Sequence, residues 1–369
     1  MIALENDRYL PKYIKVKNKI KALISEKNIN SGEQIPSESQ LANKYKVSRH
    51  TIRKAIDILV QEAVLEKKQG VGTFYQGKKS SRTGNIGFIS ISLHDYIFAD
   101  ILSAADNFLH DKNYQIILGN SQDDLKKEKE ILMQLMDKNI DGLIIEPAQS
   151  ALSSSNLNLL EEIARRNIPV LVLDSNYQSD FLNIVMVDDY QGGFLATNHL
   201  LEMGHQEIAM IYKASHNPAL ARLEGYKVAI KEAGLDLQEY LIRPYFYSEF
   251  NNQNKFENEI KDIVGQLLKN KKLTAIFTFN DQIAIIVQEI LNQKAIKVPE
   301  DISIIGFDDS MLVQLNNISI TSISHPKEKA GRKAAEIIIE QIEKNDETSV
   351  LKKVFQPFLC KRNSVKKLR

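Results

Sequence analysis

The feature that most constrains the fold is a series of seven short apolar segments spaced through the chain after residue 85. Most are rich in isoleucine, valine or leucine along nearly their whole length, as strands buried on both faces should be. Helix-like stretches such as LKKEKEILMQLMDKN and GGFLATNHLLEMG lie between them. This alternation predicts an α/β architecture with parallel sheets. The strand candidates are IGFISIS, YQIILGN, DGLIIEP, PVLVLDS, EIAMIY, AIFTFN and ISIIGFDD.

The length of this region suggests that it is divided. Residues 85–369 are many for a single open sheet, and ligand clefts form preferentially between domains. We therefore expect two lobes with a cleft between them. Residues 77–84 are rich in Gly, Ser and Lys and predict a linker. Residues 1–76 then form a separate N-terminal domain.

The N-terminal domain reads as three helices followed by a hairpin. Ser37 and Gln40 have the spacing of a capping box and predict a helix through Tyr45. Ser48 is placed to cap the next helix. The stretch VLEKKQGVGTFYQ predicts two short strands around a glycine-containing turn, which completes a winged helix-turn-helix. The apolar side of the first helix carries Ile14, Ile20, Leu23 and Ile24.

The third predicted helix has one apolar and one basic face. Arg49, His50 and Arg53 lie opposite the apolar side. Such a helix fits the major groove of DNA, where Arg contacts guanine or phosphate. His50 and Thr51 are candidates for further base or phosphate contacts, and the helix N-terminus at Ser48 for a phosphate contact. The alternative is a solvated face in which Asp57 pairs with Arg53. The apolar side is formed by Ile52, Ala55, Ile56 and Leu59.

The distribution of charge favours DNA as a partner. Residues 1–76 hold 14 basic and 8 acidic residues, a net charge of +6, whereas the remainder holds 34 and 39, a net of −5. Basic residues concentrated in one domain are the electrostatic footprint of nucleic-acid binding. The whole chain carries a net charge of only +1.

Several other classes of protein are disfavoured. Cys360 is the only cysteine, so no intramolecular disulfide is possible. The sequence has no recognisable secretion signal and no apolar run that predicts a membrane span, so we expect a cytoplasmic protein. Hydrolase, zinc-protease and P-loop motifs are absent, as is a paired-cysteine metal site. We therefore predict neither an enzyme nor a cofactor.

The stretch IPSESQLANKYKVSRHTIRKAIDILVQEAVLEKKQGVGTF resembles the DNA-binding domain of the GntR family of bacterial regulators. That family touches its operator with the starts of the second and third helices and the wing tip. Lys12 would lie near the DNA backbone. Glu38 would be unfavourable beside phosphate, so it either accepts from a cytosine amino group or only favours its own helix N-terminus. The resemblance implies contacts from Glu38, Ser39, Arg49, His50, Arg53, Gln69 and Gly70.

Polar residues gather at the ends of the later strand candidates, which is where open α/β sheets bind ligands. Carboxylates and amides there suit sugar hydroxyls, and an arginine would fork across two of them. For Asp281 a role as helix cap is the alternative, for Asp174 a structural role, and for Asp188 and Asp189 capping is the preferred interpretation. The ligand candidates are Glu146, Arg222, Asn280, Asp281 and Asp308.

The segments LTAIFTFNDQIAI, KAIKVPEDISIIGFDDS and ITSISHP resemble the effector domain of the LacI/GalR regulators. Those domains are related to periplasmic sugar-binding proteins, which again implies two lobes. At His325 the family more often has Gln. The resemblance implies ligand contacts from Asp95, Tyr96, Phe98, Arg222, Asn280, Asp281 and His325.

A GntR-type head on a LacI-type effector domain is uncommon, and it resembles the arabinose-responsive repressors of bacterial pentose operons. The resemblance implies a homodimeric repressor of sugar-utilisation genes. It would bind palindromic double-stranded operator DNA and be released by a small sugar, with L-arabinose as the expected effector. The alternatives are another sugar or a phosphosugar in the same architecture, and a sugar-processing enzyme or ligand carrier.

Overall fold

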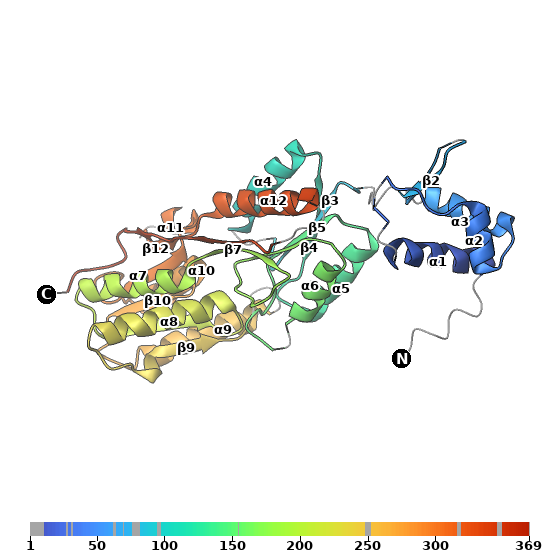
Figure 1. Cartoon of the computed structure of the whole chain (residues 1–369). Helices are drawn as coiled ribbons and strands as arrows, with labels where there is room; N and C mark the ends of the chain where they lie inside the picture. The colour runs from blue at the N-terminus through green and yellow to red at the C-terminus, as the bar shows by residue number, and fades with distance from the viewer. Residues whose placement is uncertain are drawn as a thin grey trace. The chain divides into compact units, whose positions relative to one another are not determined.

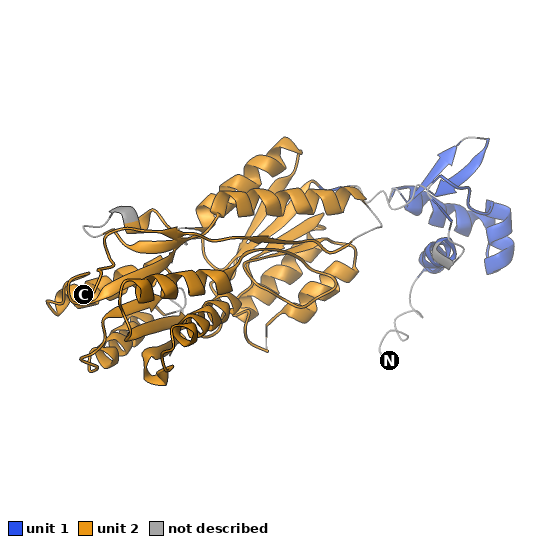
Figure 2. Cartoon of the chain, turned by 60° about the vertical axis from the view of Figure 1, so that its left-hand side comes forward, with its two compact units in different colours: residues 1–83 blue, residues 84–369 orange. Residues whose placement is uncertain are grey.

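The computed structural model of the chain contains two compact units, residues 1–83 and residues 84–369 (Figure 2). Most of the predicted linker lies outside the described residues. The structure describes residues 11–26, 29–30, 32–61, 64–68, 70–75, 82–93, 97–153, 155–247, 252–315, 319–344 and 349–368.

The first unit is a winged helix-turn-helix (Figure 1). Ser37 and Gln40 form the predicted capping box at the start of α2, and Lys46 turns the chain after α2 in a left-handed conformation with φ of 52°. The strands β1 and β2 pair antiparallel as the predicted wing. The elements are α1 (Lys12–Glu26), α2 (Glu38–Tyr45), α3 (Arg49–Gln61), β1 (Leu65–Lys68) and β2 (Gly72–Tyr75).

The core of this unit confirms the predicted helix faces. The four residues of the predicted apolar side of α3 are buried, and they pack against the apolar side of α1 and against Leu41 of α2. Burial of one face of each helix leaves the opposite faces exposed, including the basic side of α3. The buried residues of α3 are Ile52, Ala55, Ile56 and Leu59.

The second unit contains two lobes, each built on a six-stranded sheet. In the first lobe all strand pairs are parallel, in the order β13-β7-β6-β5-β3-β4. Helices α4 and α12 lie side by side on one face (Figure 1). The elements are β3 (Asn85–Ser90), α4 (Phe98–Asp111), β4 (Gln115–Asn120), α5 (Leu125–Asp137), β5 (Gly142–Ile145), α6 (Leu157–Arg165), β6 (Val170–Leu173), β7 (Asn183–Val187), α12 (Lys327–Lys344) and β13 (Lys352–Phe355).

The second lobe has the strand order β14-β12-β11-β10-β8-β9, in which only the edge strand β14 pairs antiparallel. The chain passes between the lobes after β7, after β12 and after β13. The elements are α7 (Asp189–Glu202), β8 (Ile208–Lys213), α8 (Asn217–Glu232), the 3-10 helix η2 (Glu239–Leu241), β9 (Ile242–Tyr245), α9 (Gln253–Leu267), β10 (Ala275–Thr278), α10 (Asp281–Gln293), β11 (Ser303–Asp308), α11 (Leu312–Leu315), β12 (Thr321–Ser324) and β14 (Leu359–Cys360).

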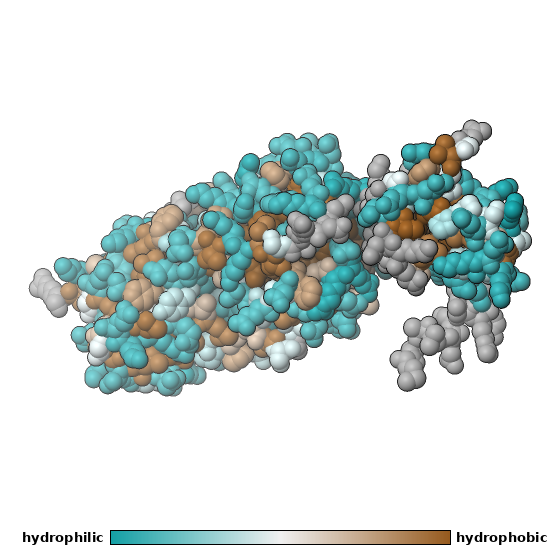
Figure 3. Space-filling view, in the orientation of Figure 1, coloured by the Kyte–Doolittle hydropathy of each residue, from teal (hydrophilic) through white to brown (hydrophobic). Residues whose placement is uncertain are grey.

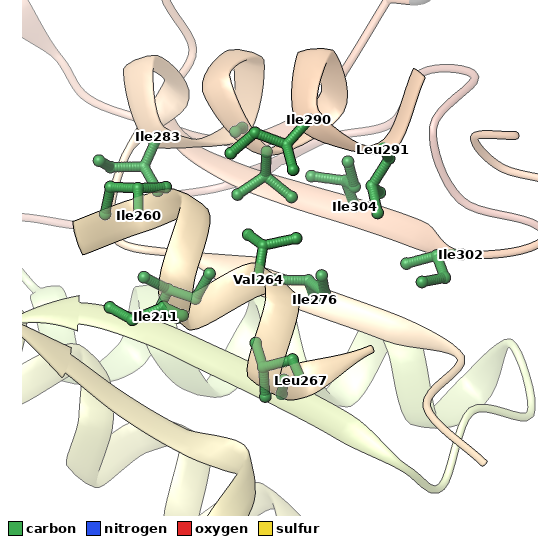
Figure 4. Close-up of a cluster of buried hydrophobic side chains, with 14 of the residues drawn as sticks. Ile211, Ile260, Val264, Leu267, Ile276, Ile283, Ile290, Leu291, Ile302 and Ile304 are labelled. Atoms are coloured by element: carbon green, nitrogen blue, oxygen red, sulfur yellow. The ribbon is translucent and has the colours of Figure 1, made fainter. Parts of the chain in front are cut away.

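Each sheet is buried on both faces, which explains the apolar runs. In β10, Ile276 joins a cluster with α9 and α10, whereas Phe277 joins a cluster on the opposite face with α7 and α8. Figure 4 shows the first of these clusters, where Val264 of α9 lies beside Ile276 and Ile290 of α10 lies near Ile304. Successive side chains of a strand point to opposite faces, so both must be apolar.

All seven predicted strands are present, but five others were not predicted. β7 is largely apolar and was missed. β9 contains Arg243 and Pro244, β12 contains three hydroxyl residues, and the edge strands β13 and β14 carry Lys352, Lys353 and Cys360, so these four are not apolar runs. Their pairing partners lie far away in the sequence, as for β13 on β7. The prediction of an α/β fold with a winged helix and two lobes is nevertheless confirmed.

No described helix is long and apolar enough to cross a membrane. On the face of the molecule in Figure 3, hydrophobic residues form patches among hydrophilic ones.

Candidate nucleic-acid interface and ligand cavity

The start of α3 presents exposed basic residues. Arg49 and His50 are both exposed. Ser48 caps the helix, because its Oγ accepts from the backbone N–H of Thr51 at 3.2 Å and lies 2.9 Å from the hydroxyl of Thr51. The two hydroxyls are therefore engaged with each other and with the cap, while the arginine and histidine face solvent.

Arg53 pairs with Glu38, and not with Asp57 as the alternative interpretation held. Its Nε lies 3.3 Å from both carboxylate oxygens of Glu38, and its Nη2 donates to Oε2 at 3.0 Å. The hydrogen bond and charge of Glu38 raise the pKa of Arg53. Asp57 instead lies 2.5 Å from Nζ of Lys67 on the wing. The pair joins the starts of α2 and α3, and it gives Glu38 a role that needs no DNA base.

The remaining predicted DNA contacts border the same helices. Lys12 is the exposed first residue of α1, and Ser39 is half-buried at the start of α2. Gly70 is exposed at the wing tip with φ of 74°, a left-handed conformation that favours glycine. Gln69 lies outside the described residues. The structure thus places α2 beside α3 through the Arg53–Glu38 pair, and the wing beside α3 through the Lys67–Asp57 pair.

A polar cavity lies between the two lobes of the second unit. Five of the predicted ligand residues line it, and they come from strand ends of both lobes and from α8. Asp174 and Asp308, at the ends of β6 and β11, have φ values of 48° and 99°. Such conformations are costly for residues other than glycine and concentrate at functional sites. The lining consists of Ile91, Ile97, Glu146, Pro147, Asp174, Ser175, Lys213, His216, Pro218, Arg222, Tyr245, Phe279, Asn280, Asp308 and His325.

Arg222 is held in the cavity by several contacts within the protein. Its Nε donates to Asp189 at 2.8 Å and its Nη1 to the backbone oxygen of Phe279 at 2.5 Å. Its Cζ lies 3.4 Å from the ring centroid of Phe307, a cation–π distance. Burial raises the pKa of Asp189 to about 6, although Arg222 acts against this. Nε and one hydrogen of Nη1 are used within the protein, which leaves Nη2 and the second hydrogen of Nη1 on the side of the guanidinium where Nη2 lies 3.9 Å from Asp308. The fork across two sugar hydroxyls therefore stays a prediction.

His325 joins the second lobe to Asp174 of the first. Its Nε2 lies 3.1 Å from both oxygens of Asp174. Burial opposes its charged form, but the carboxylates of Asp174, Asp308 and Asp189 outweigh burial and raise the pKa of His325. Its Nδ1 is buried and has no hydrogen-bond partner among the described residues. The carboxylates around His325 therefore favour the charged form of its imidazole.

Two predicted ligand residues do not line the cavity. Asp281 is fully buried and accepts from Ser310 N at 2.7 Å and from Ser322 Oγ at 2.6 Å. The cap of α10 is instead Asn280, whose side chain accepts from Ile283 N. Phe98 is buried edge-to-face against Phe88 in the core of the first lobe. Asp281 thus anchors the loop after β11, and Phe98 is a core residue.

Other predictions on loops have mixed outcomes. Asp95 and Tyr96 lie outside the described residues. Asp188 caps α7 as predicted, with its side chain accepting from Gln191 N, whereas Asp189 pairs with Arg222 and is not the cap.

Several residues that line the cavity were not predicted from the sequence. Lys213 is a polar residue at the end of β8, as Glu146 is at the end of β5, so the same criterion would have predicted it as a cavity residue. His216 and Phe279 had no such signal in the sequence. Phe279, not Phe98, supplies an aromatic ring to the cavity. Among the described residues, no group of histidine, cysteine and carboxylate side chains is arranged to hold a metal ion.

Two family models match the chain. Residues 12–74 match the bacterial regulatory proteins of the gntR family, and residues 197–365 match the periplasmic binding protein-like domain. These ranges fall in the first unit and in the second, respectively.

Relatives match over nearly the whole length. The chain is 33% identical to the arabinose metabolism transcriptional repressor of Geobacillus stearothermophilus, over 98% of this chain and 100% of that protein. It is 32% identical to the repressor of the same name from Halalkalibacterium halodurans, over 96% of each. A LacI family transcriptional regulator from Enterococcus faecium, solved with bound ribose, is 26% identical, with a TM-score of 0.66, and covers 77% of this chain and 100% of its own.

These relatives are transcriptional repressors, which confirms the prediction of a regulator and not an enzyme. The chain belongs to the family of sugar-responsive transcriptional repressors that combine a GntR-type DNA-binding domain with an effector domain of the LacI/GalR type.

Proposed function

We propose that L-arabinose is the effector of this repressor. The observation that carries the proposal is the polar lining of the cavity. Glu146, Asp174 and Asp308 offer carboxylates to hydroxyl groups, Asn280 offers an amide, and Phe279 offers an aromatic ring. This combination suits the hydroxyls and the apolar face of a small neutral sugar. The names of the two relatives that align over nearly the whole chain support the same sugar.

The DNA partner in this proposal is a palindromic operator bound by a homodimer. Each copy supplies one winged helix with Arg49 and His50 exposed at the start of α3. Two-fold symmetry of the protein matches two half-sites on the duplex. Light scattering on the free protein and on its complex with a duplex of one palindrome tests the stoichiometry. Two copies per duplex are expected, and one copy would contradict the dimer.

Release by the sugar follows from linkage. L-arabinose must bind the conformation that is incompetent for DNA more tightly than the competent one, and operator DNA must then weaken sugar binding by the same factor. Fluorescence anisotropy of a labelled operator, titrated with sugar, measures one side of this coupling. Calorimetric titration of sugar into the protein with and without operator measures the other.

The first experiment is a thermal-shift panel of L-arabinose, D-ribose, D-xylose, D-glucose and arabinose 5-phosphate. A ligand that binds only the folded state must raise the melting temperature. L-arabinose is expected to raise it most and to release the operator. A larger shift with D-ribose would move the assignment toward the ligand of the Enterococcus faecium regulator. A shift with the phosphosugar alone would reject a neutral effector.

A further inference from the structure

Asp123 lies outside the cavity lining but contacts two residues of that lining from the opposite lobe. It follows β4 in the first lobe and is 2% exposed. Its Oδ2 lies 2.8 Å from Nζ of Lys213, and its Oδ1 lies 3.3 Å from Nε2 of His216. Lys213 and His216 belong to the second lobe and line the cavity. We call these three residues the clasp.

The first lobe holds Asp123 in place independently of the second. The backbone N–H of Gln149 donates to Oδ1 of Asp123 at 3.2 Å, and Nε2 of Gln149 donates to the backbone oxygen of Asp123 at 2.7 Å. The backbone of Asp123 is left-handed, with φ of 57°. A non-glycine residue in this conformation must be supported by its surroundings. The carboxylate is therefore oriented by its own lobe toward the other.

Hydrogen bonds also join the loop after β5 in the first lobe to the segment between β8 and α8 that carries His216. Ser150 accepts from Asn217 N at 3.0 Å, and Asn217 Nδ2 donates to the backbone oxygen of Ser150 at 3.1 Å. Ala151 N donates to the backbone oxygen of Ser215 at 3.0 Å. Each bond joins the first lobe to the second. Together they form a contact that exists only when the lobes are close.

The charges of the clasp make this contact sensitive to lobe separation. Burial opposes ionisation of Asp123, but His216 and Lys213 outweigh burial and hold the pKa of Asp123 below its usual range. A buried charge is stable only beside its partner, because removing one partner leaves the other charge buried and unpaired. Any separation of the lobes must break the pair and hydrate both groups.

We propose that Asp123 is a positioning residue for the effector response, because it holds Lys213 and His216 against the cavity only when the lobes are closed. The inference rests on the proposed sugar-binding function of that cavity. A sugar that binds between the lobes then stabilises the clasp, and the clasp strengthens sugar binding by the same factor. Asp123 thereby couples occupancy of the cavity to closure of the second unit.

The test compares the native protein with Asp123→Asn, Lys213→Met and the double variant. Glu162→Gln is the matched control, because it removes an exposed pair with Arg166 within the first lobe. The full-length protein is titrated with L-arabinose while operator release is followed. In a Cys360→Ser background, spin labels at Lys129→Cys and Lys231→Cys, one exposed site on each lobe, report the distance between lobes.

Asp123→Asn is expected to need at least about tenfold more L-arabinose for both operator release and lobe closure. Its operator affinity without sugar should be unchanged, as should every property of Glu162→Gln. The double variant removes both buried charges, so it should regain melting temperature but not sugar sensitivity. The double variant and Lys213→Met should need the same L-arabinose concentration for operator release, because the two substitutions disrupt the same contact.

The inference is overturned if Asp123→Asn releases the operator, or closes its lobes, at the same L-arabinose concentration as the native protein. It is also overturned by recovery of sugar sensitivity together with melting temperature in the double variant, which would mean that Asp123 acts only on stability. If Asp123→Asn does not fold, Lys213→Met and the double variant decide between these outcomes. If L-arabinose fails to release the native protein, the effector assignment fails instead, and closure is measured with the sugar that gives the largest thermal shift.

Discussion

The guanidinium of Arg53 and the carboxylate of Glu38 form a two-pronged ion pair between the starts of α3 and α2. Arg49 and Arg53 are both exposed on α3, and the pair holds Arg53 in one orientation. We expect Arg49→Ala and Arg53→Ala each to weaken operator binding by about tenfold or more. L-arabinose should still raise their melting temperatures as in the native protein. Unchanged operator affinity in both variants would remove the start of α3 from the interface.

Glu38→Gln separates the two interpretations of Glu38. The substitution frees Arg53 and raises the charge of the DNA-facing surface by one unit, so binding to random duplexes should tighten at low salt. Discrimination between operator and random DNA should fall. Asp57→Asn is the control, because it changes the charge equally but leaves the Arg53 pair intact. Equal discrimination by the two variants would show that orientation of Arg53 is unimportant.

Arg222→Met should abolish the sugar response and destabilise the second unit. Asp189 would remain buried without its partner, which costs about 3–5 kcal/mol. The pKa of Asp189 is already raised to about 6, so protonation should relieve part of the loss at pH 5. Urea unfolding at pH 5 and pH 8 measures this difference. Arg332→Ala, at an exposed arginine of α12, should show neither effect. An equal loss for Arg222→Met at both pH values would contradict the pairing argument.

Gly193→Ala should destabilise the packing of α7 on α8. A Cβ at Gly193 would lie 2.1 Å from the backbone oxygen of Arg222, which has little freedom to move. Overpacking of this kind costs about 1–3 kcal/mol. Gly265→Ala in α9 is the matched control, since its Cβ would meet no atom within 4 Å. That change should stabilise the protein by about 0.5–1 kcal/mol. The two glycines should therefore give unfolding free energies that shift in opposite directions, and a shift of the same sign would contradict the close approach.

Glu128 should make stability fall as pH rises. Burial raises its pKa from 4.5 to about 7, against hydrogen bonds from Ala148 and Asn156. The folded state then holds a proton that the unfolded state has lost, so the stabilisation is complete below about pH 4.5 and is lost as pH rises through 7. Its size is roughly 2–3 kcal/mol. Urea unfolding of Glu128→Gln should show a smaller decline between pH 5 and pH 8 than the native protein. Glu130→Gln, exposed on the same helix, should keep the native slope, and equal slopes in all three proteins would exclude Glu128.

The amino-acid sequence by itself determined the features that depend on neighbouring residues. The Ser37–Gln40 capping box, the hairpin around Gly70 and the apolar runs of the buried strands all act within a few residues. The same local signals placed Glu146, Asn280 and Asp308 at strand ends, where parallel sheets bring them to one cavity. The position of polar residues at strand ends therefore predicted several of the residues that line the cavity.

Only the tertiary structure decided which side chains meet. Arg53 pairs with Glu38 across two helices, although Asp57 is nearer in sequence. Asp281 faces Ser310 and Ser322 in the interior, while its neighbour Asn280 lines the cavity. Asp123 and Lys213 meet because the two lobes come together. Such contacts depend on how elements distant in the chain pack, because packing decides which charges are buried and therefore which must be paired.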